Sequence, residues 1–299
     1  MYEHDHHSHD TSGGKALATA IVCTLTFAAV EFVAGWWAGS LALMADAGHM
    51  LTDSTALGLA ALAAWLATRP ANKRRTWGHG RAEVLAAMVN GLVMLALVAV
   101  IAWQAVLRFQ EPQEVKGLVV MLVATIGLGI NILVLLILRR ARRNINIRGA
   151  MLHVIGDLLG SVAALTAGAV ILLTGWMPID PILSLFICVL ILIAAFRLLR
   201  EGVHVVMEGV PGGLDLEQVR SAMNEIARVR EIHDLHIWQV SSERVALSAH
   251  VVITDLRQWP DILAELNGML EERFGIDHPT LQPEPATIED CDTPQACRD

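Results

Sequence analysis

Cysteine is scarce in this chain, and charged side chains are nearly absent from its longest segments. Only four of the 299 residues are cysteines, and two of these, Cys23 and Cys188, lie inside apolar segments, so no disulfide scaffold is predicted. The sequence also lacks the Gly-x-x-x-x-Gly-Lys-Ser/Thr loop of nucleotide-driven pumps and the His-Glu-x-x-His helix of metalloproteases. These absences exclude a P-loop pump and an intramembrane metalloprotease of that kind.

Long apolar runs dominate the first two thirds of the sequence. Hydrophobic residues make up 54% of the chain and the mean hydropathy is +0.50, which is rare for a soluble protein of this length. The first run is too long for the apolar core of a secretory signal, carries Glu31 and follows a His/Asp-rich stretch instead of a basic one. We therefore predict an integral membrane protein with an all-α bundle of six transmembrane helices. The six runs cover residues 16–38, 41–66, 82–107, 117–138, 150–176 and 182–199.

Basic residues are unevenly distributed between these runs. The second and fourth connections carry five Lys/Arg residues each, the third carries Arg108 and Lys116, and the first and fifth carry none. By the positive-inside rule, the second and fourth connections face the cytoplasm, together with both chain termini. The predicted location is a bacterial inner (plasma) membrane.

The sequence after residue 210 has a different character. Residues 211–299 contain 7 Lys/Arg and 17 Asp/Glu, so the acidity of the chain, with its net charge of −8, belongs to this tail. An acidic tail argues against nucleic-acid binding and is compatible with cations.

Pro211, Gly212 and Gly213 mark the boundary between the membrane segments and the tail domain. Beyond it we predict a helix from Asp215 to about residue 229, strands over 232–240 and 244–254, a helix over 259–274 and a strand over 280–284. This α-β-β-α-β order is that of a ferredoxin-like α+β domain.

Ionisable side chains inside two of the runs carry the functional information. Asp46, His49 and Asp53 follow a spacing of i, i+3 and i+7, so they share one face of a helix. The fifth run contains His153 and Asp157 and thus repeats the pattern His-x-x-x-Asp. An Asp at the centre of a membrane helix costs about 2.5–3.5 kcal/mol, and such residues generally mark a transport path.

Two imidazoles and two carboxylates are a suitable donor set for a tetrahedral Zn²⁺ ion. The i, i+4 spacing directs both side chains of a pair to the same spot, so one close contact between the two helices would complete a site. A structural network of polar groups between helices is the alternative, and a single His-x-x-x-Asp would not decide between the two. Two copies at bilayer depth favour the metal path. Such donors also bind cobalt, nickel and copper, and cadmium is a candidate secondary substrate.

Several segments of the sequence resemble the cation diffusion facilitator family of zinc transporters. The main ones are SLALMADAGHMLTDS at 40–54 and GAMLHVIGDLLGSV at 149–162. GHGRAEVLAA at 78–87, IHDLHIW at 232–238, LSAHVV near His250 and HPTLQPE near Glu284 add to the match. The resemblance covers roughly residues 15–285. It implies a homodimeric antiporter, not an enzyme, that exports a divalent metal ion in exchange for protons and needs no organic cofactor.

The resemblance also assigns residues to the membrane site. It implies that the transported ion is bound by His49, Asp53, His153 and Asp157, with Asp46 outside this set, beside the ligands or on the path of the ion. A His at the position of His49 resembles the zinc-preferring form of the family, whereas an all-Asp site admits cadmium more readily.

Histidines of the acidic tail are candidates for a second metal site. The resemblance favours His233, His250 and Glu284 for a bound regulatory Zn²⁺, with His278 as a further candidate. His236 is three residues from His233, so in a regular strand it would face the opposite side. A solvated surface histidine is the alternative for each of them. A non-transporting metal sensor would keep such a tail, but it would not require buried carboxylates in two membrane helices.

Three further groups of residues are weaker candidates for a functional role. His79 lies where some family members have a further metal site, but Asn72 and Arg75 stand where Asp and His would be expected. Arg81 and Glu208 are, by resemblance, a charge pair that holds the helices of a dimer in place. Metal binding by terminal residues would involve His4, His6, His7, His9, Cys291 and Cys297.

These interpretations divide the chain into four parts. Residues 1–14 are a His-rich N-terminal tail, and residues 15–210 are a six-span transmembrane transport domain. Residues 211–286 are a cytoplasmic metal-binding domain, and residues 287–299 are a disordered C-terminal tail.

Overall fold

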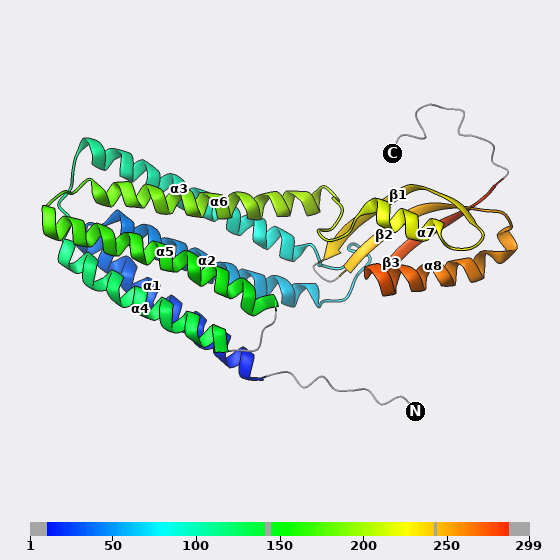
Figure 1. The fold of residues 1–299 in the computed structure, drawn as a ribbon, viewed down its shortest axis with the longest axis horizontal. Helices are drawn as coiled ribbons and strands as arrows, with labels where there is room; N and C mark the ends of the chain where they lie inside the picture. The colour runs from blue at the N-terminus through cyan, green and yellow to red at the C-terminus, as the bar shows by residue number, and fades with distance from the viewer. Residues whose placement is uncertain (1–10, 141–144, 242–243, 287–299) are drawn as a thin grey trace. The chain divides into compact units, whose positions relative to one another are not determined.

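Six long helices form the first two thirds of the chain. The computed structural model describes residues 11–140, 145–241 and 244–286, and the side chains within 22–136, 154–241 and 244–286. Helices α2 to α6 contain stretches that are long and apolar enough to cross a membrane, and the apolar part of α1 with described side chains covers Val22–Ala38. The prediction of an all-α membrane bundle is thus confirmed. The helices are α1 Thr11–Ala38, α2 Leu41–Ala67, α3 Ala82–Gln110, α4 Gly117–Arg140, α5 Ile145–Thr174 and α6 Ile179–Val206 (Figure 1).

Small residues allow the helices of the bundle to approach one another. The chain forms two compact units, and the first comprises the residues up to Leu59 together with Val89–Leu198. Within it, α4 and α5 make the most extensive contact of the described helices. Gly168 permits this contact, since a Cβ atom there would lie 2.7 Å from the backbone nitrogen of Met121. Helix α1 packs against α4, where the Phe27 ring covers Gly127.

A buried carboxylate ties the start of α2 to two other helices. Asp180, near the start of α6, is fully buried and accepts hydrogen bonds from the Ser40 hydroxyl (2.5 Å) and the backbone N–H of Leu41 (2.7 Å). Arg108, near the end of α3, lies 3.5 Å from the same carboxylate and also donates to the carbonyl of Gly39. We call this group the Asp180 clamp. It holds the α1–α2 turn, and therefore the part of α2 that follows the turn.

The second unit comprises Ala60–Met88 and the residues from Leu199 onward, and it contains an α+β domain. The predicted order α-β-β-α-β is confirmed, and Asp215 caps the first helix by accepting a hydrogen bond from the N–H of Glu217. That helix ends at Asn224 and not near residue 229; turn residues follow it, Arg228 is left-handed (φ 79°) and the first strand begins at residue 229. The elements are α7 Leu216–Asn224, β1 Val229–Ser241, β2 Arg244–Ile253, η1 Leu256–Gln258, α8 Trp259–Phe274 and β3 His278–Pro285.

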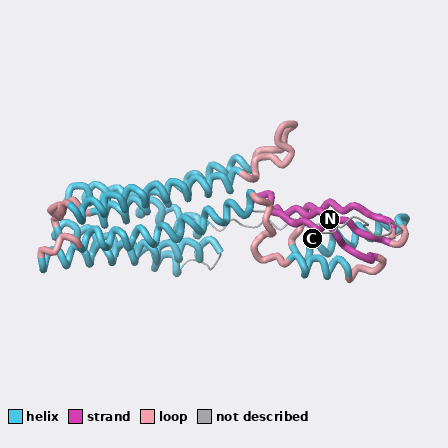
Figure 2. The backbone as a smooth tube through the Cα atoms, turned by 90° about the horizontal axis from the view of Figure 1, so that it is seen from above, coloured by secondary structure: helices cyan, strands magenta, loops and turns pink. Residues whose placement is uncertain are grey.

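The strands form one sheet in the order β1-β2-β3, with β1 antiparallel and β3 parallel to β2 (strands in magenta in Figure 2). Helix α8 supplies the crossover that a parallel pair requires. The apolar core lies between the helices and one face of the sheet, where Met223 and Leu266 pack with Ile232 and Leu247. Because side chains alternate along a strand, the residues between these apolar positions point to the other, more open face.

Candidate metal sites

The two His-x-x-x-Asp pairs lie on α2 and α5 of the first unit. On α2, the Nδ1 atom of His49 is 3.4 Å from an Asp53 oxygen, and the two side chains are 16% and 15% exposed. On α5, Asp157 is buried, with 1% exposed. His153 lies one turn before Asp157 on α5, but its side chain is outside the described residues. The helical spacing thus brings His49 and Asp53 together as predicted.

Asp46 lies against α5, on the side of His49 that is nearer the α1–α2 turn. Its carboxylate rests on the backbone of Gly160, where a Cβ atom would overlap it. The Ser161 hydroxyl lies 3.5 Å from one Asp46 oxygen, and the Asn131 amide donates to that hydroxyl (3.1 Å). The charges of Asp46 and Asp157 are close enough to interact. The contact with Gly160 therefore places Asp46 within about one turn of the predicted ligand Asp157 along α5.

Glu31 of α1 belongs to the same buried region. It is 0% exposed, and its charge interacts with those of Asp46 and Asp157. Neither of its carboxylate oxygens has a hydrogen-bond partner among the described residues. Sequence reasoning did not place Glu31 in a site, although an acidic residue inside an apolar run is the signal that could have found it.

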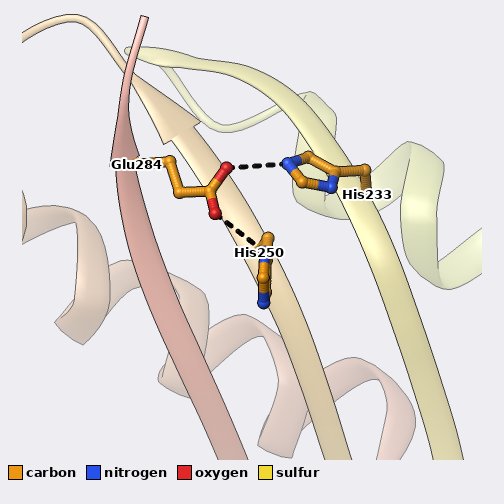
Figure 3. A group of neighbouring side chains, drawn as sticks. All are labelled: His233, His250 and Glu284. Atoms are coloured by element: carbon orange, nitrogen blue, oxygen red, sulfur yellow. Dashed lines mark hydrogen bonds and ion pairs between the residues drawn. The ribbon is translucent and has the colours of Figure 1, made fainter. Parts of the chain in front are cut away.

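Three side chains of the second unit converge on the open face of the sheet (Figure 3). Nε2 of His233 on β1 lies 2.9 Å from one oxygen of Glu284 on β3, and Nδ1 of His250 on β2 lies 2.8 Å from the other. One candidate ligand atom from each residue lies within 4.8 Å of the other two. Two imidazoles and a carboxylate can hold a zinc ion and leave one tetrahedral position for a further ligand.

His236 lies on the same face as His233, which corrects the expectation from a regular strand. His233 is paired with His250, and His236 with Ser248, so a step of three residues on β1 matches a step of two on β2. The extra residue forms a β-bulge, within which Asp234 has a left-handed φ of 50°. Asp234 lies 3.0 Å from Nε2 of His236 and 3.7 Å from Nε2 of His250.

His278 and His79 lie apart from this cluster. The ring of His278, at the start of β3, meets Trp77 edge-on, with 4.8 Å between the ring centroids. His79 lies in the α2–α3 connection, where its Nδ1 atom is buried without a hydrogen-bond partner among the described residues. In the same connection, the Asn72 side chain accepts a hydrogen bond from the N–H of Arg75 and closes a turn.

Arg81 and Glu208 form the expected charge pair, with 2.9 Å between Nη2 and Oε1. Both side chains are about half exposed, at 46% and 59%, so the pair contributes little to stability. The terminal candidates fall outside the described residues; they are His4, His6, His7, His9, Cys291 and Cys297.

Comparison with known proteins identifies the family. Residues 17–207 match the family model of the cation efflux transmembrane domain, and residues 211–286 match that of the cation efflux protein cytoplasmic domain. The chain belongs to the cation efflux family. It is therefore an integral membrane transporter and not an enzyme, as the resemblance implied.

Individual relatives cover most of this cation efflux protein. It is 43% identical over 282 residues to the zinc transporter ZitB of Pectobacterium atrosepticum, a match that covers 93% of this chain and 88% of the relative. It is 37% identical over 289 residues to the cadmium, cobalt and zinc/H(+)-K(+) antiporter of Bacillus velezensis, covering 94% and 92%. Among solved structures, the metal-bound C-terminal domain of the CzcD transporter from Cupriavidus metallidurans is 37% identical and covers 24% of this chain and 99% of that domain, with a TM-score of 0.22.

Proposed function

We propose that this transporter exports divalent transition-metal ions, chiefly Zn²⁺, from the cytoplasm in exchange for protons. The ion would be bound by His49 and Asp53 of α2 and by His153 and Asp157 of α5. The observation that carries the proposal is the pairing of His49 with Asp53 at 3.4 Å, together with a buried Asp157 on α5. Acidic side chains inside an apolar bundle are costly, and a transported cation is the group that would offset their charge.

The donor set supports zinc as the main substrate. Two imidazole nitrogens and two carboxylate oxygens match a tetrahedral Zn²⁺ ion. Co²⁺ and Ni²⁺ accept the same donors, so they are expected as secondary substrates together with Cd²⁺. The relatives are named as transporters of zinc and of cadmium, cobalt and zinc, which supports this range.

Exposure along α2 supports a site that opens to one side at a time. Asp46, nearer the α1–α2 turn, is 1% exposed, whereas His49 and Asp53 are 16% and 15% exposed. The Asp180 clamp holds the turn itself. With the basic connections and both termini in the cytoplasm of a bacterial inner membrane, the turn lies outside. The described conformation is then the one that is closed to the outside.

Competition between zinc and protons accounts for the exchange. A metal-binding imidazole must be unprotonated, its unperturbed pKa is about 6.5, and the carboxylates must be ionised. On the cytoplasmic side, near neutral pH, the empty site releases protons and binds zinc. On the outside, where the proton potential is higher, protons displace the metal and return with the empty site. Inward proton flow then drives zinc out without a nucleotide.

Proteoliposomes that contain the full chain provide the test. Zinc movement should accelerate when a pH gradient of the appropriate sign is imposed, and the compartment from which zinc is taken should become more acidic. A pH dye and a zinc dye in the same vesicles measure both fluxes. Empty liposomes give the baseline leak. Zinc flux that is indifferent to the gradient, with no accompanying proton movement, would show facilitated diffusion instead.

The cytoplasmic domain is proposed to bind a regulatory zinc ion, in a protein that acts as a homodimer. His233, His250 and Glu284 would be the ligands, since their donor atoms already face one another. This ion is distinct from the cargo, because all three ligands lie outside the membrane helices. His278 is a weaker candidate, since its ring is in contact with Trp77.

Removing His233 and His250 together should lower the zinc content of the purified chain by about one ion and leave part of the transport intact. The remaining carboxylate of Glu284 cannot hold the ion alone. Elemental analysis after equilibrium dialysis counts the metal. His204→Ala is the matched control, because this imidazole lies in the last turn of α6 and bonds the backbone carbonyl of Val210. An unchanged metal content would show that the two histidines are ordinary surface residues.

A further inference from the structure

Two buried acidic residues of the bundle lie outside the four-ligand set. Glu31 on α1 is 0% exposed and Asp46 on α2 is 1% exposed. Their charges interact with each other and with Asp157 on α5. Three helices therefore each contribute a buried carboxylate to this part of the bundle. Buried acids normally have ion-pair or hydrogen-bond partners, so Glu31 and Asp46 need an explanation.

Hydrogen bonding separates this pair from Asp180, which is equally buried. Asp180 accepts from the Ser40 hydroxyl and the Leu41 N–H at 2.5 and 2.7 Å, so its charge is satisfied by the protein. Among the residues with described side chains, Glu31 accepts no hydrogen bond, and the hydrogen bond of Asp46 is a long one, 3.5 Å from the Ser161 hydroxyl. Asp180 thus has a structural role, whereas the oxygens of Glu31 and Asp46 lack close donors among the residues with described side chains.

Position along the helices places Asp46 between the four-ligand site and the α1–α2 turn, and Glu31 at about the level of His49. Asp46 precedes His49 by three residues, which is about 4.5 Å nearer the turn at 1.5 Å per residue. Glu31 lies about two turns before the end of α1 at Ala38. Gly160, which contacts Asp46, follows Asp157 in the same direction, since α5 ends near the Asp180 clamp.

We propose that Glu31 and Asp46, with Asp157, form a second cation position, which receives the metal ion from the four-ligand site and passes it toward the α1–α2 turn. This inference rests on the proposed export function. A bare dication inside an apolar bundle is very costly, so an ion that leaves its first ligands needs further anionic oxygens within reach. Asp157 would belong to both positions, so the ion would keep a ligand throughout the step.

The donor atoms of the second position favour transient binding of the metal ion. It offers carboxylate oxygens without imidazole, and zinc, cobalt and nickel favour sites that include nitrogen donors. The ion is therefore held less tightly than in the four-ligand site and can leave. Gly160 makes the position possible, because a side chain there would displace the Asp46 carboxylate from α5.

Glu31→Gln tests the proposal, since it preserves the size of the side chain and removes the charge. Zinc uptake by full-length protein in proteoliposomes should show a maximal rate lowered about tenfold, with the half-saturating zinc concentration changed less than about twofold. Loading of the four-ligand site does not involve Glu31, so the zinc content of the purified variant should match the wild type. Glu31→Asp should recover part of the rate. Glu111→Gln, at an exposed acid just after α3, is the matched control and should transport normally.

Three outcomes would overturn the proposal. A maximal rate within about twofold of wild type would show that Glu31 is not on the path. A raised half-saturating zinc concentration together with a lower zinc content of the purified protein, in both Glu31→Gln and Glu31→Asp, would show that Glu31 acts in loading of the four-ligand site or in folding. Normal zinc flux with lost proton movement would make Glu31 a proton-binding group. Absence of zinc transport by the wild type would instead contradict the proposed function itself.

Discussion

Asp157→Ala should abolish zinc transport while the protein remains folded in the membrane. Loss of one of four ligands should weaken zinc binding by more than the ~10–100-fold that loss of a ligand's outer partner costs. The fold should survive, because Asp157 is buried near the like charges of Glu31 and Asp46, and its removal relieves their repulsion. Initial rates of zinc uptake into proteoliposomes measure the effect.

Asp53→Ala should behave in the same way, since its carboxylate lies beside His49 on α2. Glu111→Ala, at an exposed acid, is the control for loss of a carboxylate as such. Both variants need an elution profile like that of the wild type in detergent. Uptake by Asp157→Ala at more than about half of the wild-type rate would rule out Asp157 as a ligand of the transported ion.

Asp180→Ala should strongly destabilise the bundle. It would leave the Ser40 hydroxyl, the Leu41 N–H and the Arg108 guanidinium without their buried acceptor. Breaking a buried ion pair from one side costs about 3–5 kcal/mol, which for a chain of this size lowers the melting temperature by about 10 °C. Thermal unfolding of the purified protein in detergent measures the shift.

Ser40→Ala distinguishes the contribution of the Ser40 hydroxyl to stability from that of the Asp180 carboxylate. It removes one donor and leaves the Asp180 carboxylate with its backbone and Arg108 partners, so we expect a loss of only about 1 kcal/mol. Equal melting temperatures for Asp180→Ala and Ser40→Ala would show that the carboxylate is not the centre of the clamp.

Properties that depend on neighbouring residues could be predicted from the sequence. The length of an apolar run decides whether a helix can cross a bilayer, so α2 was predicted over 41–66 and found at Leu41–Ala67. The i, i+4 spacing placed His49 next to Asp53. An apolar run ends at the first charged residues, but a helix can continue through them: α6 extends to Val206, beyond the predicted end at residue 199.

Properties that depend on register or packing could not be predicted from periodicity. Strand alternation placed His236 opposite His233, but the bulge with Asp234 turned both to one face. The grouping of His233, His250 and Glu284 was suggested by family resemblance, and their proximity follows from strands that are distant in the sequence.

The sequence by itself determined the membrane bundle, the order of the α+β domain and the two His-x-x-x-Asp pairs, because helical spacing and apolar length are local properties. Only the tertiary structure decided that Glu31 and Asp46 share a buried region with Asp157 and that Asp180 holds the α1–α2 turn. These contacts join different helices, and their distances depend on how closely small residues such as Gly160 let the helices approach.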